Sequence, residues 1–338
     1  MKVVIAHRTG QARVVDLPEP KSSRGCVVVR VSHSAVQLPE ELNLLEAAPK
    51  QLKRGQDGVP IGSGASGTIL EVGAGVESLK AGLRVAVYGL PYVYHASQLV
   101  VPENLVVELP KKVNHEEGAF AGQGAIALNL LRHADLRLGE TMLVFGADLV
   151  GMLLAQLVRA AGGTPILVDE SDYRLTKAKA VGINHTHLRI DDQLVQTVAS
   201  LTDGQGVDSA VLCRRDQPGA LKAAQEMVRL GGAVVMGASI REAADLSGLR
   251  EKEARLVSAA GGGPGAGDPH FERGSMYPRP IARWTIRDNM ACFAAQLAER
   301  KVQVSPLVTD RVPLDRSQMA YEKAARGRDA VLGVVLTV

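Results

Sequence analysis

The stretch TMLVFGADLVGMLLAQLVRAAGGTPILVD, residues 141–169, decides the fold that this sequence predicts. Residues 142–145 are a short apolar run without helical periodicity, typical of a strand that is buried on both faces of a parallel sheet. The glycine turn 146–151 leads into apolar residues at helical spacing, and a second buried strand, 166–168, ends at Asp169. The order of strand, turn, helix and strand is that of a dinucleotide-binding βαβ unit.

The same stretch predicts how a dinucleotide is held. In such units the amides at the start of the helix face the pyrophosphate, and an acidic residue after the second strand binds the adenosine ribose. Asp169 lies about 20 residues after Gly146, which suits this role. A carboxylate there disfavours the additional phosphate of NADP. The expected cofactor is therefore NAD.

One position departs from the pattern G-x-G-x-x-G. The middle glycine normally lets the backbone approach the pyrophosphate, and Asp148 stands in its place. The side chain takes up room, and its carboxylate would repel a phosphate at ~4 Å by a few kcal/mol. Two interpretations stay open. Either the side chain swings aside and the cofactor binds, or the turn has lost or altered its dinucleotide binding.

The composition excludes several classes of function. The 338 residues are 46% hydrophobic, enough for a large core in two domains. The net charge is +3, no basic run occurs and 3% of residues are aromatic, so nucleic-acid binding is not supported. No apolar run approaches membrane-spanning length and the amino terminus does not resemble a secretory signal, so we expect a cytoplasmic protein that binds no membrane. The three scattered cysteines indicate neither a disulfide framework nor a metal site.

The pattern of elements changes twice along the chain. Residues 1–116 are rich in short β patterns, and residues 117–264 alternate between strands and helices. A glycine-rich loop spans residues 261–267, and residues 265–338 contain two helical segments and a last strand that we expect to return to the first domain. The predicted fold class is α/β, a Rossmann-type doubly wound parallel sheet inserted in a β-rich domain.

Four segments carry a resemblance to a known family: GTILEVGAGVESLKAGLRVAVYG (67–89), SQLVVPENLVVELPKKVNHEEGAF (97–120), the βαβ unit, and the carboxyl-terminal residues. With these the chain resembles the medium-chain dehydrogenase/reductases, the zinc alcohol dehydrogenase superfamily, over nearly its whole length. The resemblance implies that the β-rich domain is GroES-like and catalytic. The segment GPGAGDPHFERGSMYP (263–278) is similar to the dehydrogenase-like half of bacterial bi-domain oxidoreductases.

The zinc ligands of that family are not matched. Zinc members carry a cysteine near the start of the chain and then a GHE motif, because a Lewis acid polarises the substrate oxygen. Here Gln37 lies nearest the cysteine position, and GHE is replaced by Gly62, Ser63 and Gly64. The lobe that holds a structural zinc is also missing. The chain therefore resembles the zinc-independent branch, and no metal is expected.

The resemblance also implies a set of cofactor contacts. Gly146, Gly151 and Asp169 match the family pattern, and Arg174 matches an arginine that commonly follows the acidic residue. Arg214 and Arg215 replace small residues, and they could clamp a carboxylate or phosphate or pair with Asp148. The predicted contacts are Gly146, Asp148, Leu149, Val150, Gly151, Asp169, Arg174, Arg214 and Gly237.

Three residues are candidates for proton transfer in place of zinc. His95 matches a histidine of the bi-domain relatives, and imidazole can move a proton near neutral pH. The alternative for His95 is a structural histidine that is hydrogen-bonded in a turn. Glu40 stands where relatives relay a proton, although a solvated carboxylate at a helix start is the default. Ser63 occupies a former ligand position and is expected to line the pocket.

The sequence thus predicts a zinc-independent, NAD(H)-dependent oxidoreductase that acts on a hydroxyl or ketone of a polar small molecule, sugar-derived or carboxylated. One alternative is a lyase, dehydratase or isomerase on the same scaffold without nicotinamide turnover. Another is a non-catalytic partner subunit of a second oxidoreductase. The resemblance implies a homodimer.

Overall fold

The structure, a computed structural model, describes residues 1–53, 55–214, 217–237, 245–259, 261–327 and 330–338, and the chain divides into two compact units. Unit 1 comprises Met1–Gly122, Pro264–Ala298 and Leu307–Val338, and unit 2 comprises Gln123–Gly263 and Glu299–Pro306. The sequence places its boundaries after residues 116 and 264. It does not separate the short segment Glu299–Pro306, which the structure groups with unit 2.

Unit 2 is built on a six-stranded parallel sheet with the order β11-β10-β9-β12-β13-β14. The strands are β9 (Thr141–Phe145), β10 (Thr164–Val168), β11 (His185–His187), β12 (Val207–Leu212), β13 (Val228–Met236) and β14 (Arg255–Ser258). The first strand, β9, lies in the centre of the sheet. The chain continues outward through β10 to β11 and then crosses to β12 on the other side of β9, so the strand order reverses between β9 and β12. This is the doubly wound order that binds ligands at the switch point, and the predicted fold class is confirmed.

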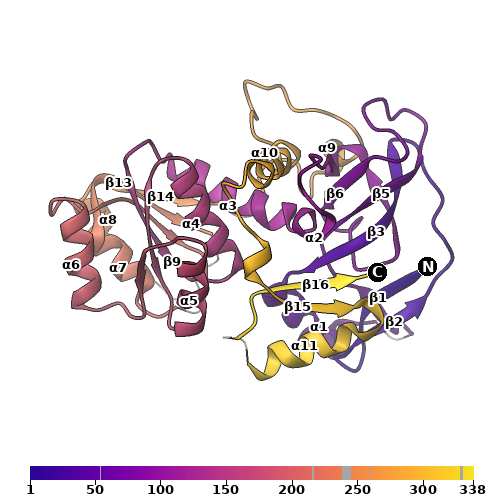
Figure 1. The fold of residues 1–338 in the computed structure, drawn as a ribbon, viewed down its shortest axis with the longest axis horizontal. Helices are drawn as coiled ribbons and strands as arrows, with labels where there is room; N and C mark the ends of the chain where they lie inside the picture. Colours follow the sequence, from indigo (N-terminus) through magenta and orange to yellow (C-terminus); the bar gives the residue numbers. More distant parts are fainter. Residues whose placement is uncertain (54, 215–216, 238–244, 260, 328–329) are drawn as a thin grey trace. The chain divides into compact units, whose positions relative to one another are not determined.

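One helix precedes the first strand of this sheet, and the others lie on the connections between its strands (Figure 1). They are α3 (Ala121–Ala134), which begins in unit 1, α4 (Leu149–Ala160), α5 (Asp172–Ala180), α6 (Asp192–Leu201), α7 (Ala220–Met227) and α8 (Ser247–Glu251). All five residues of β9 are buried, as the apolar run predicts for a central parallel strand. One core cluster joins Phe145 of β9, Val168 of β10 and Leu194 of α6.

Unit 1 contains two β-sheets. The smaller one is antiparallel, in the order β2-β1-β4, and the larger one has the order β15-β16-β3-β5-β6-β8, with β7 paired to β3. The strands are β1 (Lys2–His7), β2 (Ala12–Asp16), β3 (Cys26–Val36), β4 (Gly58–Pro60), β5 (Gly64–Val72), β6 (Arg84–Tyr88), β7 (Gln98–Pro102), β8 (Val106–Glu108), β15 (Val308–Pro313) and β16 (Gly333–Thr337). The helices are α1 (Leu38–Gln51), α2 (His115–Gly118), α9 (Pro269–Glu272), α10 (Ile286–Ala298) and α11 (Ser317–Arg326), with short 3-10 turns at Glu103–Leu105, Ser305–Leu307 and Leu314–Arg316.

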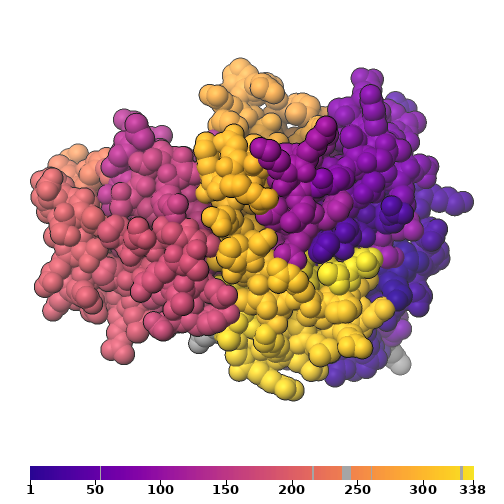
Figure 2. Space-filling view, in the orientation of Figure 1, coloured from indigo at the N-terminus to yellow at the C-terminus, as the bar shows by residue number. Residues whose placement is uncertain are grey.

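Both ends of the sequence contribute to unit 1. Strand β16 pairs antiparallel with β3, with Val334 opposite Val36, so the last strand returns to the first domain as predicted. In Figure 2 the yellow surface of the carboxyl-terminal residues adjoins the indigo and purple surface of the amino-terminal ones. Within the residues described, the structure has no helix of the length and apolarity that a bilayer crossing requires.

Candidate active site

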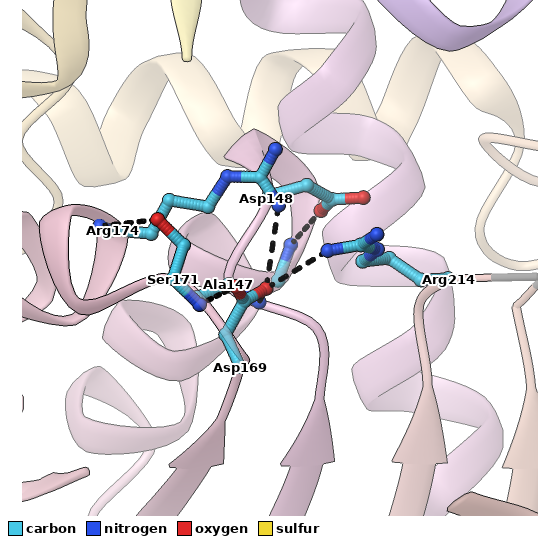
Figure 3. Close-up of polar contacts among 7 residues, drawn as sticks. Ala147, Asp148, Asp169, Ser171, Arg174 and Arg214 are labelled. Atoms are coloured by element: carbon cyan, nitrogen blue, oxygen red, sulfur yellow. Dashed lines mark hydrogen bonds and ion pairs between the residues drawn. The ribbon is translucent and has the colours of Figure 1, made fainter. Parts of the chain in front are cut away.

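The glycine turn after β9 is tied to the end of β10. Gly146 has φ 104°, a left-handed conformation that glycine adopts without strain, and its amide donates to the Val168 carbonyl at 2.8 Å. The next amide, of Ala147, donates to Asp169 Oδ2 at 2.7 Å. The turn and the acidic residue predicted from the sequence are therefore one hydrogen-bonded assembly, drawn in Figure 3.

Asp148, the residue that departs from the family pattern, is the N-cap of α4. Its Oδ1 accepts from the Gly151 amide at 2.9 Å, so the side chain uses one of the helix amides that a phosphate would otherwise contact. A Cβ at Gly151 would lie 1.9 Å from the Gly146 carbonyl oxygen, so only glycine allows the helix to approach the turn this closely. Leu149 and Val150 are the first two residues of α4.

The ionisation of Asp148 is opposed by its surroundings. Burial raises the pKa of this carboxyl above its ordinary value of 3.8, and the nearby Asp169 adds to the increase. The Gly151 hydrogen bond and the charges of Arg174 and Arg214 act in the opposite direction without cancelling the effect of burial.

Asp169 is 1% exposed and lies at the centre of the assembly. Its Oδ1 accepts from the Ser171 amide at 2.9 Å. Its Oδ2 accepts from the Ala147 amide and from two guanidinium groups, Arg174 Nη1 at 3.5 Å and Arg214 Nη1 at 3.3 Å. The predicted acidic residue thus has backbone donors that fix its orientation and two cations that balance its charge.

Arg214 covers the glycine turn. A Cβ at Gly146 would lie 2.7 Å from Arg214 Cγ, which places the aliphatic part of the arginine directly over the glycine. The sequence left open whether Arg214 pairs with Asp148. Arg214 forms an ion pair with Asp169, and its charge also acts on Asp148. Arg215 lies outside the described residues, and Gly237, the other predicted contact, follows β13 and donates its amide to the Leu212 carbonyl at 2.9 Å.

The backbone of this assembly suits a dinucleotide, but two of its side chains differ from the usual dinucleotide-binding pattern. The left-handed glycine, the start of α4 and the carboxylate after β10 are the parts that hold the pyrophosphate and adenosine ribose in such folds. Asp148 and Arg214 occupy space that the glycine-only pattern leaves open. A dinucleotide therefore fits here if the Arg214 side chain moves off the turn.

Unit 1 contains a second polar cluster, around Gln37 and Ser63, the two residues that the sequence resemblance assigns to the zinc-ligand positions. Ser63 Oγ donates to Gln37 Oε1 at 2.8 Å. Tyr88 lies at the end of β6, opposite Gly64 of β5, and is 9% exposed. Burial, followed by the Glu40 carboxylate, raises the pKa of Tyr88 to about 12, against the effect of hydrogen bonds with Ser63 and Gln37.

Glu41 and His95 form a buried network behind this cluster. His95 Nε2 lies 2.9 Å from Glu41 Oε2, which also accepts from the Tyr321 hydroxyl at 2.6 Å. Ser34 Oγ donates to the Gly64 carbonyl and lies 2.6 Å from His95 Nδ1, so this ring nitrogen donates to Ser34. With Glu41 at Nε2, both ring nitrogens of His95 are engaged in this network.

Glu41 is connected to the first cluster through the backbone. The Gln37 amide donates to Glu41 Oε1 at 2.8 Å, so Glu41 closes the start of α1 and the Gln37 side chain is directed to Ser63 instead of capping its own helix. Burial would raise the pKa of Glu41, but the charge and hydrogen bond of His95, the Tyr321 hydroxyl and the Gln37 amide outweigh it and lower the pKa.

The structure places the predicted catalytic candidates in different environments. His95 is fully buried with both ring nitrogens engaged, and Ser63 is 8% exposed beside Gln37. Glu40 is exposed, whereas the neighbouring Glu41 is 2% exposed and contacts His95. The sequence pointed to Glu40 and missed Glu41, Tyr88 and Tyr321. The one available signal for Glu41 was its place in the first turn of a helix.

The donors of this cluster do not suit zinc. Gln37, Ser63 and Tyr88 offer amide and hydroxyl oxygens, while zinc sites in proteins use thiolate, imidazole and carboxylate groups. Within the described ranges, no group of three or more His, Cys, Asp or Glu residues is arranged to hold a metal ion. The arrangement can instead donate hydrogen bonds to a substrate oxygen.

Comparisons with known proteins agree with this architecture. The family model described as zinc-binding dehydrogenase matches residues 150–269. The (R,R)-butanediol dehydrogenase of Bacillus subtilis is 30% identical over 241 residues, covering 62% of this chain and 69% of that protein. The sorbitol dehydrogenase of Gallus gallus is 25% identical over 359 aligned positions, covering 96% of this chain and 93% of that protein. The crystal structure of 2R,3R-butanediol dehydrogenase from Bacillus subtilis aligns with a TM-score of 0.79 at 21% identity, over 100% of this chain and 99% of that one.

Proposed function

The chain belongs to the medium-chain dehydrogenase/reductase superfamily and is a dehydrogenase-type enzyme, and on this premise we propose that it is a zinc-independent, NAD(H)-linked oxidoreductase. Its reaction interconverts a hydroxyl and a carbonyl group on a polar small molecule. Relatives named for butanediol and sorbitol support a polyol or sugar-derived substrate. Such a substrate presents several hydroxyl groups, which suits a cluster of neutral hydrogen-bonding side chains.

The observation that carries the zinc-independent mechanism is the hydrogen bond between Ser63 Oγ and Gln37 Oε1. These two residues stand where zinc members place their cysteine and histidine ligands, and they are bonded to each other. A substrate oxygen would here be polarised by hydrogen bonds instead of a Lewis acid.

The proton is handled by residues of unit 1. When bound, the nicotinamide supplies or accepts the hydride. With its pKa raised to about 12, Tyr88 is fully protonated at neutral pH, and its hydroxyl can donate a hydrogen bond to a carbonyl oxygen. Glu40 is exposed and lies near enough to raise the Tyr88 pKa, which suits exchange of the proton with solvent. Ser63 orients the substrate oxygen beside Tyr88.

His95 has a different role in this proposal. Both of its ring nitrogens are engaged in a fully buried network, so it holds Glu41 instead of transferring a proton to substrate. Glu41 in turn binds the Gln37 amide and thereby fixes the Gln37 side chain beside Ser63. His95 and Glu41 are therefore positioning residues.

NAD(H) is assigned to the assembly around the glycine turn. The amides at the start of α4 would face the pyrophosphate, and Asp169 would accept from the adenosine ribose. The buried carboxylate after β10 supports NADH over NADPH, because the additional phosphate would meet a negative charge. By family resemblance the enzyme is a homodimer, and light scattering on the purified protein tests this with twice the chain mass of 35.8 kDa as the expected value.

Calorimetric titration of cofactor-stripped protein tests the cofactor assignment. We expect NADH to bind with a dissociation constant in the micromolar range and NADPH to bind more weakly. Absence of binding by either dinucleotide would contradict the proposal. A polyol or sugar that is consumed without any change in nicotinamide absorbance would point to a lyase, dehydratase or isomerase on this scaffold. Co-purification with a second oxidoreductase would point to a partner subunit.

A further inference from the structure

Arg214 holds an unusual place for an arginine in a dinucleotide-binding turn. Its aliphatic part lies over Gly146, with Cγ and Cδ 2.7 and 3.0 Å from the position of a Cβ on that glycine. Its guanidinium reaches back to Asp169 Oδ2, as Figure 3 shows. The arginine therefore spans the turn that would receive the pyrophosphate and ends on the carboxylate that would receive the ribose.

The contact between Arg214 and Asp169 is longer than the backbone contacts of this carboxylate, and of the two arginines that meet Asp169, Arg214 is the more exposed. Its length is 3.3 Å, whereas the Ala147 and Ser171 amides donate to Asp169 at 2.7 and 2.9 Å. Charge-assisted hydrogen bonds are usually about 2.7–2.9 Å long. The Arg214 side chain also keeps 22% of its surface exposed. Asp169 thus keeps its orientation if Arg214 leaves, and Arg214 has room to leave.

A pyrophosphate at this turn needs a cation. The start of α4 already donates its Gly151 amide to Asp148, so the helix offers fewer free amides than a glycine-only turn does. Asp148 also brings an acidic group next to the phosphate position. A guanidinium binds a phosphate through two parallel hydrogen bonds and offsets such a charge.

Resting on the proposed NAD(H) function, we infer that Arg214 is a displaceable counter-ion that moves from Asp169 to the cofactor pyrophosphate on binding. In the free enzyme it neutralises Asp169 and covers Gly146. In the complex its guanidinium pairs with the pyrophosphate and compensates for Asp148. Its departure opens one side of Asp169 Oδ2 to the adenosine ribose while the Ala147 amide and Arg174 stay in place, so binding of the phosphates and binding of the ribose are coupled through one side chain.

The coupling has a signature that a merely structural arginine lacks. NADH carries the pyrophosphate, so removal of the Arg214 guanidinium deletes an attractive contact. Adenosine carries the ribose without any phosphate, so it must displace Arg214 from Asp169 without a compensating contact. The substitution Arg214→Ala should therefore weaken NADH binding and strengthen adenosine binding.

The experiment is a titration of the native chain, Arg214→Ala and Arg255→Ala with NADH and with adenosine. Arg255 is an exposed arginine of β14 and serves as the matched control. NADH affinity is followed by calorimetry and adenosine affinity by ligand-observed NMR. We expect Arg214→Ala to bind NADH roughly 10- to 100-fold more weakly and to bind adenosine more tightly. Arg255→Ala should change neither affinity.

The outcomes separate the two proposals. Equal or same-direction changes for NADH and adenosine in Arg214→Ala overturn the counter-ion role and leave the NAD(H) assignment intact. Failure of the native chain to bind NADH overturns the NAD(H) assignment itself. In the background of Asp148→Asn, which keeps the cap oxygen but removes the charge, the loss caused by Arg214→Ala should become smaller. An unchanged loss there would show that Arg214 does not compensate for Asp148.

Discussion

At the scale of single residues, Glu41 shows how strongly one helical position decides the environment of a carboxylate. The sequence presents Glu40 and Glu41 side by side at the start of α1, and composition does not distinguish them. Adjacent helical residues point about 100° apart, so one is exposed while the other meets His95 and Tyr321. The partners of Glu41 are distant in sequence, His95 in the loop before β7 and Tyr321 on α11, and periodicity alone could not reveal them.

The buried pair makes a prediction about stability. Glu41→Gln keeps the shape but removes the charge that accepts from His95, so it should lower the free energy of unfolding by about 1.5–3 kcal/mol. Glu40→Gln, at an exposed site, should change it by less than about 0.5 kcal/mol. Urea denaturation at neutral pH measures both variants, and equal effects would contradict the pairing.

The same pair predicts a pH dependence. The folded-state pKa of Glu41 lies below its ordinary value of 4.5. The ionised carboxylate therefore stabilises the fold above that value, and this contribution is lost as the pH falls through the folded-state pKa. The stability difference between the native chain and Glu41→Gln should shrink in acid. A difference that stays constant down to the acid transition would be evidence against the assigned ion pair.

Tyr88 carries the catalytic part of the account at this scale. Tyr88→Phe removes the hydroxyl and keeps the ring. The ring packs directly on Gly122, because a Cβ at that glycine would lie only 1.9 Å from it. We expect kcat to fall by about 100-fold or more, as for the loss of one hydrogen-bond donor to the reacting oxygen, with NADH affinity nearly unchanged. Steady-state kinetics with calorimetry tests this, and native kcat in the variant would remove Tyr88 from the mechanism.

At the scale of elements, the βαβ unit is the part that sequence predicts best. The apolar run of β9, the periodicity of α4 and the acidic residue after β10 are local signals. The partner of Arg214 is not local, because 45 residues separate it from Asp169 and only the sheet order places β12 beside β9. The sequence could therefore name both residues without assigning the contact between them.

The cap of α4 leads to a prediction with two variants. Asp148→Asn keeps an oxygen that accepts from the Gly151 amide. It removes the carboxyl group, whose pKa is raised by burial. A raised carboxyl pKa means that stability declines as the pH rises through it, so the asparagine variant should be at least as stable as the native chain at neutral pH. Asp148→Ala should be about 1 kcal/mol less stable than Asp148→Asn. Thermal unfolding measures the order, and equal stability of these two variants would argue against the cap.

The close approach of α4 to the turn predicts a steric effect. In Gly151→Ala the new Cβ would meet the Gly146 carbonyl oxygen at 1.9 Å, so the helix must shift. We expect a loss of about 1–3 kcal/mol of stability and weaker NADH binding. Gly327→Ala, where nothing lies within 4 Å of the added atom, is the control. Equal tolerance of both substitutions would mean that the helix and turn are not in contact.

At the scale of the whole molecule, the sequence predicts two domains and the doubly wound sheet because alternation of strands and helices is a property of long segments. It does not predict that Glu299–Pro306 joins unit 2, since that grouping depends on tertiary contacts such as the Gln303 amide donating to Gln156 Oε1 at 2.8 Å. Helices and strands can be predicted from local sequence patterns. The unit to which a short connecting segment belongs can be assigned only when the residues that it packs against are known.

The measurement that tests the central claim most directly is oxidation of a polyol panel, including butanediol and sorbitol, with NAD as acceptor by protein dialysed exhaustively against a zinc chelator. The account predicts turnover that is unchanged by the chelator and by added zinc, and that is lost in Tyr88→Phe. Activity that disappears with the chelator and returns with zinc would contradict it, because the hydrogen-bonded pair of Ser63 and Gln37 would then not replace the metal.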